Sequence, residues 1–222
     1  MMQNLPVGYN LRIPMHIQRT ILTVSLLLAF TISYGQVKFK VVQKETDTWR
    51  NIYCLVDTNG KTIRQLDTST YYACFTFDSY GYFAIFQKED VKGWAAIDAD
   101  ENVLFTVYNT SFGEPTPDNI VEDKIRIVDS ADLIGFANSK GKIIIRPKFE
   151  MVTSFHNGKA IIGQSCKKIL WGDGHLKESD CHHYSIICKK YGFINAKGDV
   201  KKIGNYSFEQ IAKEINWKEA EE

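Results

Sequence analysis

The sequence predicts an all-β protein of tandem antiparallel β-hairpin repeats, preceded by a signal-peptide helix and followed by a short capping helix. Three observations predict this class. A short phrase of large and small apolar residues occurs four times, each phrase ends on Asp or Asn at the start of a turn, and the runs after the turns are rich in β-branched and aromatic residues. With 44% apolar and 24% charged residues, the chain has the composition of a folded protein.

Residues 1–35 are expected to be a cleaved signal peptide. An apolar run at residues 21–32 follows Arg19 and precedes the small residue Gly35. The run is shorter than the roughly 20 residues that cross a bilayer, so we expect no stable membrane span after cleavage. An exported bacterial protein, periplasmic or secreted, is therefore predicted. The alternatives are a retained N-terminal anchor and a true start at Met15.

Residues 36–206 are expected to form the repeat array. Its four phrases are Tyr53–Asp57, Trp94–Asp98, Ile134–Asn138 and Tyr191–Asn195. In each turn an Asx side chain accepts backbone hydrogen bonds, and a Gly supplies a positive φ. The predicted turn positions are Asp57, Gly60, Asp98, Asn138, Gly141, Asn195 and Gly198. Glu101 takes the place of Gly in the second copy, so that turn is expected to be strained or shifted.

These features resemble the WG (Trp-Gly) β-repeat family. The resemblance rests on Tyr191–Asn195, on the Asx-x-Lys-Gly turns and on the step Pro147-Lys148-Phe149-Glu150. The copies are degenerate, because Cys54 and Ala95 stand where the family has Gly. The resemblance covers roughly residues 49–205 and implies hairpins that bury one another's aromatic faces.

Residues 207–222 are expected to form a short helix that caps the end of the array. Ser207 and Gln210 have the spacing of a capping box. The apolar residues that would share one helical face are Phe208, Ile211, Ala212 and Ile215.

Five cysteines in an exported chain suggest disulfides, and their odd number leaves at least one thiol over. The last two phrases are farther apart than the others, which indicates a Cys- and His-rich insertion at about residues 165–187. If this insertion extends one hairpin, Cys166 could lie opposite Cys188 and form a disulfide. Cys54 and Cys74 fit either a second bridge or two buried thiols.

The same insertion offers candidate metal ligands. They are His175, Cys181, His182 and His183. No Cys-x-x-Cys clip accompanies them, and neighbours in a strand point to opposite faces, so we expect no metal and no cofactor. An envelope metal-binding or redox protein that uses this insertion is the alternative function.

The bulk properties favour a binding role. A net charge of +1 provides neither a phosphate-neutralising stripe nor a polybasic cluster, so nucleic acid is not an expected partner. The sequence contains no Gly-x-Ser-x-Gly elbow and no phosphate-binding loop, so we expect no catalytic residues and no enzyme. We predict a non-catalytic exported binding or scaffolding module, whose partner is a protein or glycan in the envelope or outside the cell.

Overall fold

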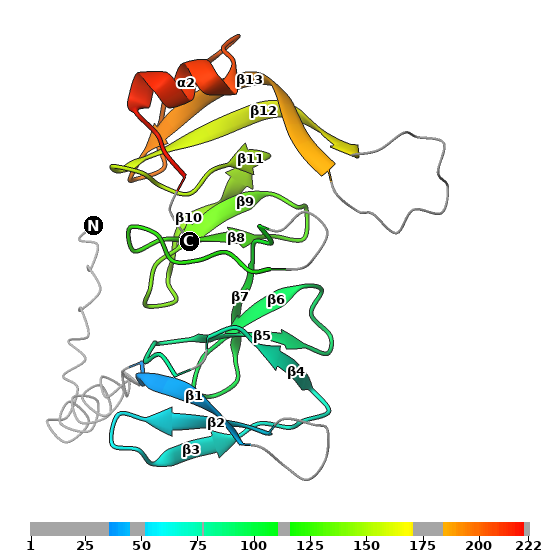
Figure 1. Ribbon diagram of the computed structural model, residues 1–222, viewed down its shortest axis with the longest axis vertical. Coiled ribbons are helices and arrows are strands. Elements are labelled where there is room, and N and C mark those ends of the chain that lie inside the picture. The colour runs from blue at the N-terminus through cyan, green and yellow to red at the C-terminus, as the bar shows by residue number, and fades with distance from the viewer. Residues whose placement is uncertain (1–35, 45–51, 77, 111–115, 171–183, 220–222) are drawn as a thin grey trace, which may run out of the picture. The chain divides into compact units, whose positions relative to one another are not determined.

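The computed structural model describes residues 36–44, 52–76, 78–110, 116–170 and 184–219 (Figure 1). These residues belong to one compact unit, which begins at Gln36. The predicted signal peptide at 1–35 lies outside the described residues. No helix in the described ranges is long and apolar enough to cross a membrane.

The described strands form three antiparallel sheets, so the predicted all-β class is confirmed. The first sheet holds β1 (Phe39–Lys44), β2 (Ile52–Asp57) and β3 (Thr62–Gln65). The second sheet has the order β10-β9-β8-β7-β6-β5-β4 and consists of β4 (Tyr71–Cys74), β5 (Ala84–Lys88), β6 (Trp94–Ile97), β7 (Val103–Val107), β8 (Ile125–Val128), β9 (Ile134–Ala137) and β10 (Ile143–Phe149). The last sheet holds β11 (Met151–Val152), β12 (Lys159–Leu170), β13 (Tyr184–Asn195) and β14 (Val200–Gly204).

Each predicted hairpin is present, and a further strand that precedes each phrase extends it to a meander of three strands. The four phrases form β2, β6, β9 and the end of β13, and each pairs on both edges, in the sets β1-β2-β3, β5-β6-β7, β8-β9-β10 and β12-β13-β14. All four residues of β6 and of β9 are buried. A strand that is buried on both faces needs partners on both edges, because its backbone N–H and C=O groups have no access to water.

The turns after the phrases share one geometry. Asn138 Oδ1 accepts hydrogen bonds from the backbone N–H of Lys140 at 3.2 Å and of Lys142 at 3.0 Å. Gly141 has a φ of +76°. Glu101 stands at the corresponding place in the second copy with a φ of +66°, which is the expected strain.

A fifth turn of the same kind joins β8 to β9 and was not predicted. Asp129 Oδ1 accepts from the backbone N–H of Ala131 and of Leu133, both at 2.9 Å. Asp132 takes the Gly position with a φ of +59°. Asp132, like Glu101 in the second copy, stands where the other turns have Gly, so this turn does not match the pattern Asx-x-x-Gly.

The core is shared between neighbouring sheets. One buried cluster joins residues of β1 and β2 to residues of β4, β5 and β6. A second cluster lies on the opposite face of the second sheet and includes Ile85, Ala96 and Ile127. A third joins Ile134 and Phe136 of β9 to residues of β11, β12 and β13. The first and third clusters join residues of different sheets, so the repeats stabilise one another.

The helix α2 (Phe208–Ile215) begins with the predicted capping box. Ser207 Oγ accepts from the backbone N–H of Gln210 at 3.2 Å, and Gln210 Oε1 accepts from the N–H of Ser207 at 2.9 Å. Ile211 and Ile215 are buried against Ile161 of β12 and Tyr191 of β13. The helix thus covers a face of the last sheet, as Figure 1 shows, rather than an unpaired strand edge.

The cysteines separate into two kinds. Cys166 and Cys188 form the predicted disulfide between facing positions of β12 and β13. Cys54 and Cys74 are buried free thiols, so they act as small apolar residues rather than as a second bridge.

Candidate functional site

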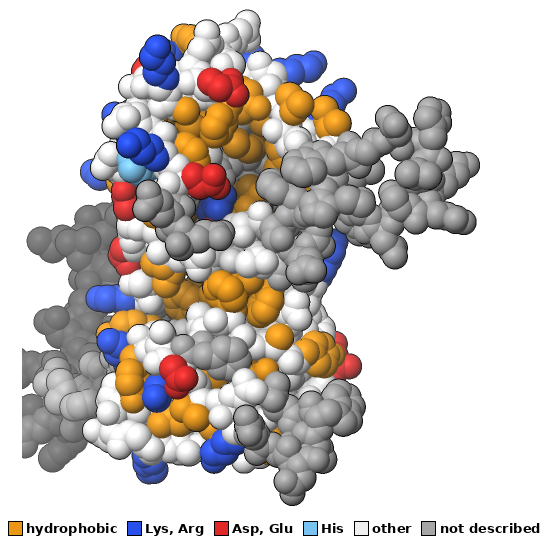
Figure 2. All heavy atoms as spheres, in the orientation of Figure 1, with side chains coloured by type: hydrophobic (Ala, Val, Ile, Leu, Met, Phe, Trp, Pro, Cys, Tyr) orange, Lys and Arg blue, Asp and Glu red, His pale blue; other side chains and the backbone are white. Residues whose placement is uncertain are grey.

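A cleft opens where the second and last sheets meet. It consists of two adjoining hollows of about 290 and 260 Å³, and both are lined by Tyr108 and Ile186. The larger hollow is also lined by Arg126, Phe208 and Trp217. Figure 2 shows apolar side chains gathered around a hollow between α2 and β11, with basic and acidic side chains beside it.

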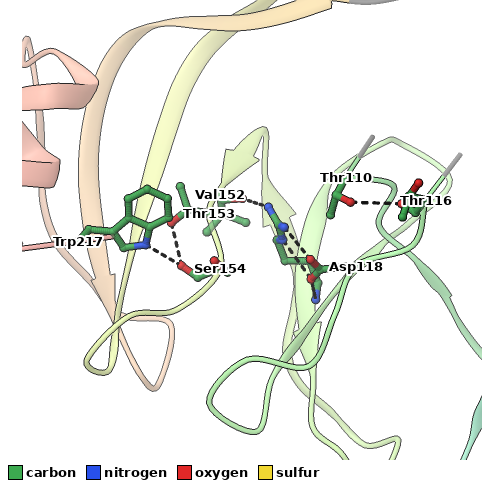
Figure 3. Close-up of polar contacts among 8 residues, drawn as sticks. Thr110, Thr116, Asp118, Val152, Thr153, Ser154 and Trp217 are labelled. Atoms are coloured by element: carbon green, nitrogen blue, oxygen red, sulfur yellow. Dashed lines mark hydrogen bonds and ion pairs between the residues drawn. The ribbon is translucent and has the colours of Figure 1, made fainter. Parts of the chain in front are cut away.

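Arg126, which lines the larger hollow, forms an ion pair with Asp118. Arg126 of β8 donates from Nη2 to Asp118 Oδ1 at 2.6 Å and from Nε to Oδ2 at 3.1 Å. Its Nη1 donates to the backbone oxygen of Val152 at 3.3 Å (Figure 3). The side chains are 16% and 6% exposed, so little water competes for these bonds. The guanidinium therefore joins β8 of the second sheet to β11 of the last.

The ion pair controls the electrostatics of the cleft. Burial lowers the pKa of Arg126, but the hydrogen bond and charge of Asp118 outweigh burial, so the net shift is upward. The guanidinium carbon lies 4.8 Å from the centre of the Tyr108 ring, a cation–π contact. Burial raises the pKa of Tyr108, and Arg126 opposes that shift. Tyr108 is therefore a neutral phenol and Arg126 a charged guanidinium at physiological pH.

Aromatic side chains form the other side of the larger hollow. Trp217 Nε1 donates to the backbone oxygen of Ser154 at 2.9 Å (Figure 3). The Phe208 ring meets the Trp217 ring edge to face at 5.8 Å. These two contacts hold the indole in one orientation. Glu219, which also lines the hollow, adds a negative charge near Arg126.

The smaller hollow carries charges of both signs. Lys92 and Lys168 supply positive charge, and Asp132 and Glu150 supply negative charge. The hollow lies next to the disulfide arm, because Lys168 and Ile186 face each other across β12 and β13. Together the two hollows can stack a flat ligand on aromatic rings and offer it hydrogen-bond donors and acceptors.

The structure keeps the predicted turn residues apart from the cleft. The residues Asp57, Gly60, Asp98, Asn138, Gly141, Asn195 and Gly198 lie at turns after the phrases and line neither hollow. The disulfide at Cys188 lies two positions from Ile186, which lines both hollows.

The candidate metal ligands lie outside the described residues. They are His175, Cys181, His182 and His183. Within the described ranges, no group of three His, Cys, Asp or Glu side chains suits a metal ion. The metal-binding alternative stays a prediction.

Sequence reasoning missed the residues of the cleft. A signal was present, since Arg126 is the one charged residue among the apolar side chains of β8. Such an Arg in an alternating strand is ordinarily expected to face water. Here it faces the last sheet, and Asp118, eight residues earlier, neutralises it. Ile125 and Ile127 point into the second core cluster, so Arg126 lies on the opposite face of β8, where it meets Val152 of the last sheet.

Comparison with known proteins supports the repeat assignment. Residues 134–164 match the family model of the WG containing repeat, a range that runs from β9 into β12. A search of curated proteins finds no match. The match includes the Ile134–Asn138 phrase, its turn and the Pro147–Glu150 step, which carried the resemblance in the sequence. Residues 134–164 are therefore similar to a WG containing repeat, which supports the predicted repeat family for this part of the chain.

Proposed function

We propose that the protein is a non-catalytic binding module that is exported to the periplasm or secreted and holds a protein or glycan partner in the cleft between its second and last sheets. The observation that carries the proposal is the rigid, mixed lining of this cleft. Ligand sites are concave, largely preformed and lined by apolar or aromatic side chains with a few oriented polar groups. Tyr108, Trp217 and Arg126, which Asp118 orients, have this composition.

The rigidity of the lining supports binding. The Arg126 guanidinium is held by Asp118, Val152 and the Tyr108 ring, and the Trp217 indole by Ser154 and Phe208. Side chains that are already ordered lose little conformational entropy when a partner binds. The non-catalytic role rests on the sequence, and the exported location rests on the predicted leader at 1–35.

Export is tested by expressing the full chain in a bacterial host and analysing the product. We expect the mature protein in the periplasm or medium, with Gln36 as its first residue by N-terminal sequencing. A cytoplasmic product that keeps residues 1–35 would contradict export.

The cleft is tested by comparing two variants that each remove one aromatic ring. Trp217→Ala removes a ring from the cleft, and Tyr72→Ala removes a ring that is 56% exposed and lines neither hollow. The immobilised proteins are exposed to solubilised envelope proteins and glycans. We expect Trp217→Ala to reduce capture of a bound component that Tyr72→Ala leaves unchanged. Equal capture by both variants and the natural protein would exclude the cleft as the binding site.

A further inference from the structure

We infer that the ligand of the cleft is an uncharged glycan chain rather than an extended peptide, an inference that rests on the binding role proposed above. The backbone that borders the cleft disfavours a peptide strand. A peptide that adds a strand to a sheet needs a row of unpaired N–H and C=O groups. That row is not available at residues 152–154.

Three polar backbone groups of this border are already engaged. The oxygen of Val152 accepts from Arg126, and the oxygen of Ser154 accepts from Trp217 Nε1 and from Thr153 Oγ1, both at 2.9 Å (Figure 3). The N–H of Thr153 donates to the oxygen of Ile161 at 3.0 Å. A peptide strand would have to break these bonds, whereas a ligand that binds through side chains leaves them intact.

The charges of the cleft nearly balance. Asp118 neutralises Arg126, and the other charged residues of the lining that the structure describes are two basic and three acidic: Lys92, Lys168, Asp132, Glu150 and Glu219. An anionic polymer would therefore gain no net attraction in the cleft. The ligand class that fits is neutral and hydrogen-bonds through groups that both donate and accept.

The larger hollow presents both hydrogen-bond donors and aromatic rings. Among the described residues, Asp118 and Val152 take three of the five guanidinium N–H groups of Arg126, which leaves two in the same plane. Two neighbouring sugar hydroxyls can accept from such a planar pair of donors. The C–H face of a sugar ring packs on an aromatic ring, and Trp217, Phe208 and Tyr108 all line this hollow.

The cleft is longer than one hollow. The two hollows adjoin at Tyr108 and Ile186, so the cleft continues beyond the aromatic end toward Lys168 and Tyr184. A single sugar ring would fill only one hollow. The cleft therefore suits a chain of two or more sugar units.

The inference is tested by isothermal titration calorimetry on the purified protein. The probes are cellotetraose, maltotetraose and chitotetraose, their monosaccharides, the anionic polymer polygalacturonate and a mixture of extended peptides. We expect at least one neutral tetrasaccharide to bind, more tightly than its monosaccharide. Binding should be weakened about tenfold or more by Trp217→Ala. Trp217→Phe, which keeps a ring, should retain most of the affinity, and Tyr72→Ala should retain all of it.

Three outcomes would overturn the glycan inference. Binding of the peptides in a way that depends on Trp217, with no neutral glycan bound, would reject it and leave the proposed binding role standing. Binding of polygalacturonate with a steep salt dependence would show that the ligand is charged. If no probe and no envelope component binds in a way that depends on Trp217, the glycan inference and the proposed binding site both fail.

Discussion

Replacing Gly192 by Ala should strongly destabilise the last repeat. Gly192 is the second residue of the fourth phrase, on β13. A Cβ atom there would lie 1.8 Å from the backbone oxygen of Lys202, 2.6 Å from its carbonyl carbon and 2.7 Å from the Cα of Ile203. All three contacts are with the backbone of β14, so no side chain can rotate away to make room.

The size of the effect follows from these distances. Real Cβ contacts essentially never fall below 3.0 Å, so β14 would have to move by about 1 Å relative to β13. Overpacking of this kind costs about 1–3 kcal/mol, and we place Gly192→Ala at the upper end because the movement also disturbs the ladder bonds between the two strands.

Urea unfolding measures the cost, and Gly60→Ala provides the control. Gly60 has a φ of +82°, and a Cβ atom there would have no neighbour within 4 Å, so Ala meets only the left-handed backbone penalty of about 1–2 kcal/mol. We expect Gly192→Ala to lose more free energy of unfolding than Gly60→Ala. An equal or smaller loss would refute the view that close approach of β14 requires Gly in this phrase.

Three further predictions concern the ion pair, the disulfide and a buried thiol. Asp118→Asn should lower the free energy of unfolding by about 3 kcal/mol, because it leaves the Arg126 charge without a counter-charge. Adding Arg126→Met to the same chain should restore most of that free energy. Strictly additive losses in urea unfolding would contradict this coupling. Cys166→Ser combined with Cys188→Ser should cost about 3 kcal/mol, because the bridge spans 22 positions and restricts the unfolded chain; unchanged stability would contradict this. Burial raises the pKa of Cys74 to about 12, whereas the thiol of the unfolded chain ionises near 9. The neutral thiol therefore contributes fully to the free energy of unfolding below pH 9. Above pH 9 this contribution falls by up to about 1.4 kcal/mol per pH unit, because the unfolded chain loses the proton first. Native Cys74 should also resist iodoacetamide at pH 8, as judged by mass spectrometry, and rapid labelling would contradict its burial.

The repeats illustrate how local chemistry can be predicted. The Asx side chain of each turn bonds to N–H groups only two and four residues away, as at Asn138, so the signal lies within one short segment. The capping box of Ser207 and Gln210 has the same local character. The pairing of Cys166 with Cys188 could also be predicted, because aligning the two arms of one hairpin places these residues opposite each other.

The fifth turn and the additional strand of each unit were not predicted from the sequence. Asp129 makes the same bonds as Asn138, but Asp132 replaces the Gly that would have identified its turn. The strand that precedes each phrase, β1, β5, β8 or β12, completes its unit, and the predicted hairpins included only the strand that follows the phrase.

By itself, then, the sequence determined the all-β class, the main turns, the closing helix and the disulfide partners, because each depends on bonds between residues that are close along the chain or aligned by one hairpin. Tertiary structure alone decided that Arg126 faces inward, that Asp118 and Val152 hold it, and that Trp217 lies across the same hollow. These side chains come from separate strands and from the segment after α2. Their meeting depends on how two sheets pack, and that packing is the sum of many weak contacts that no single motif records.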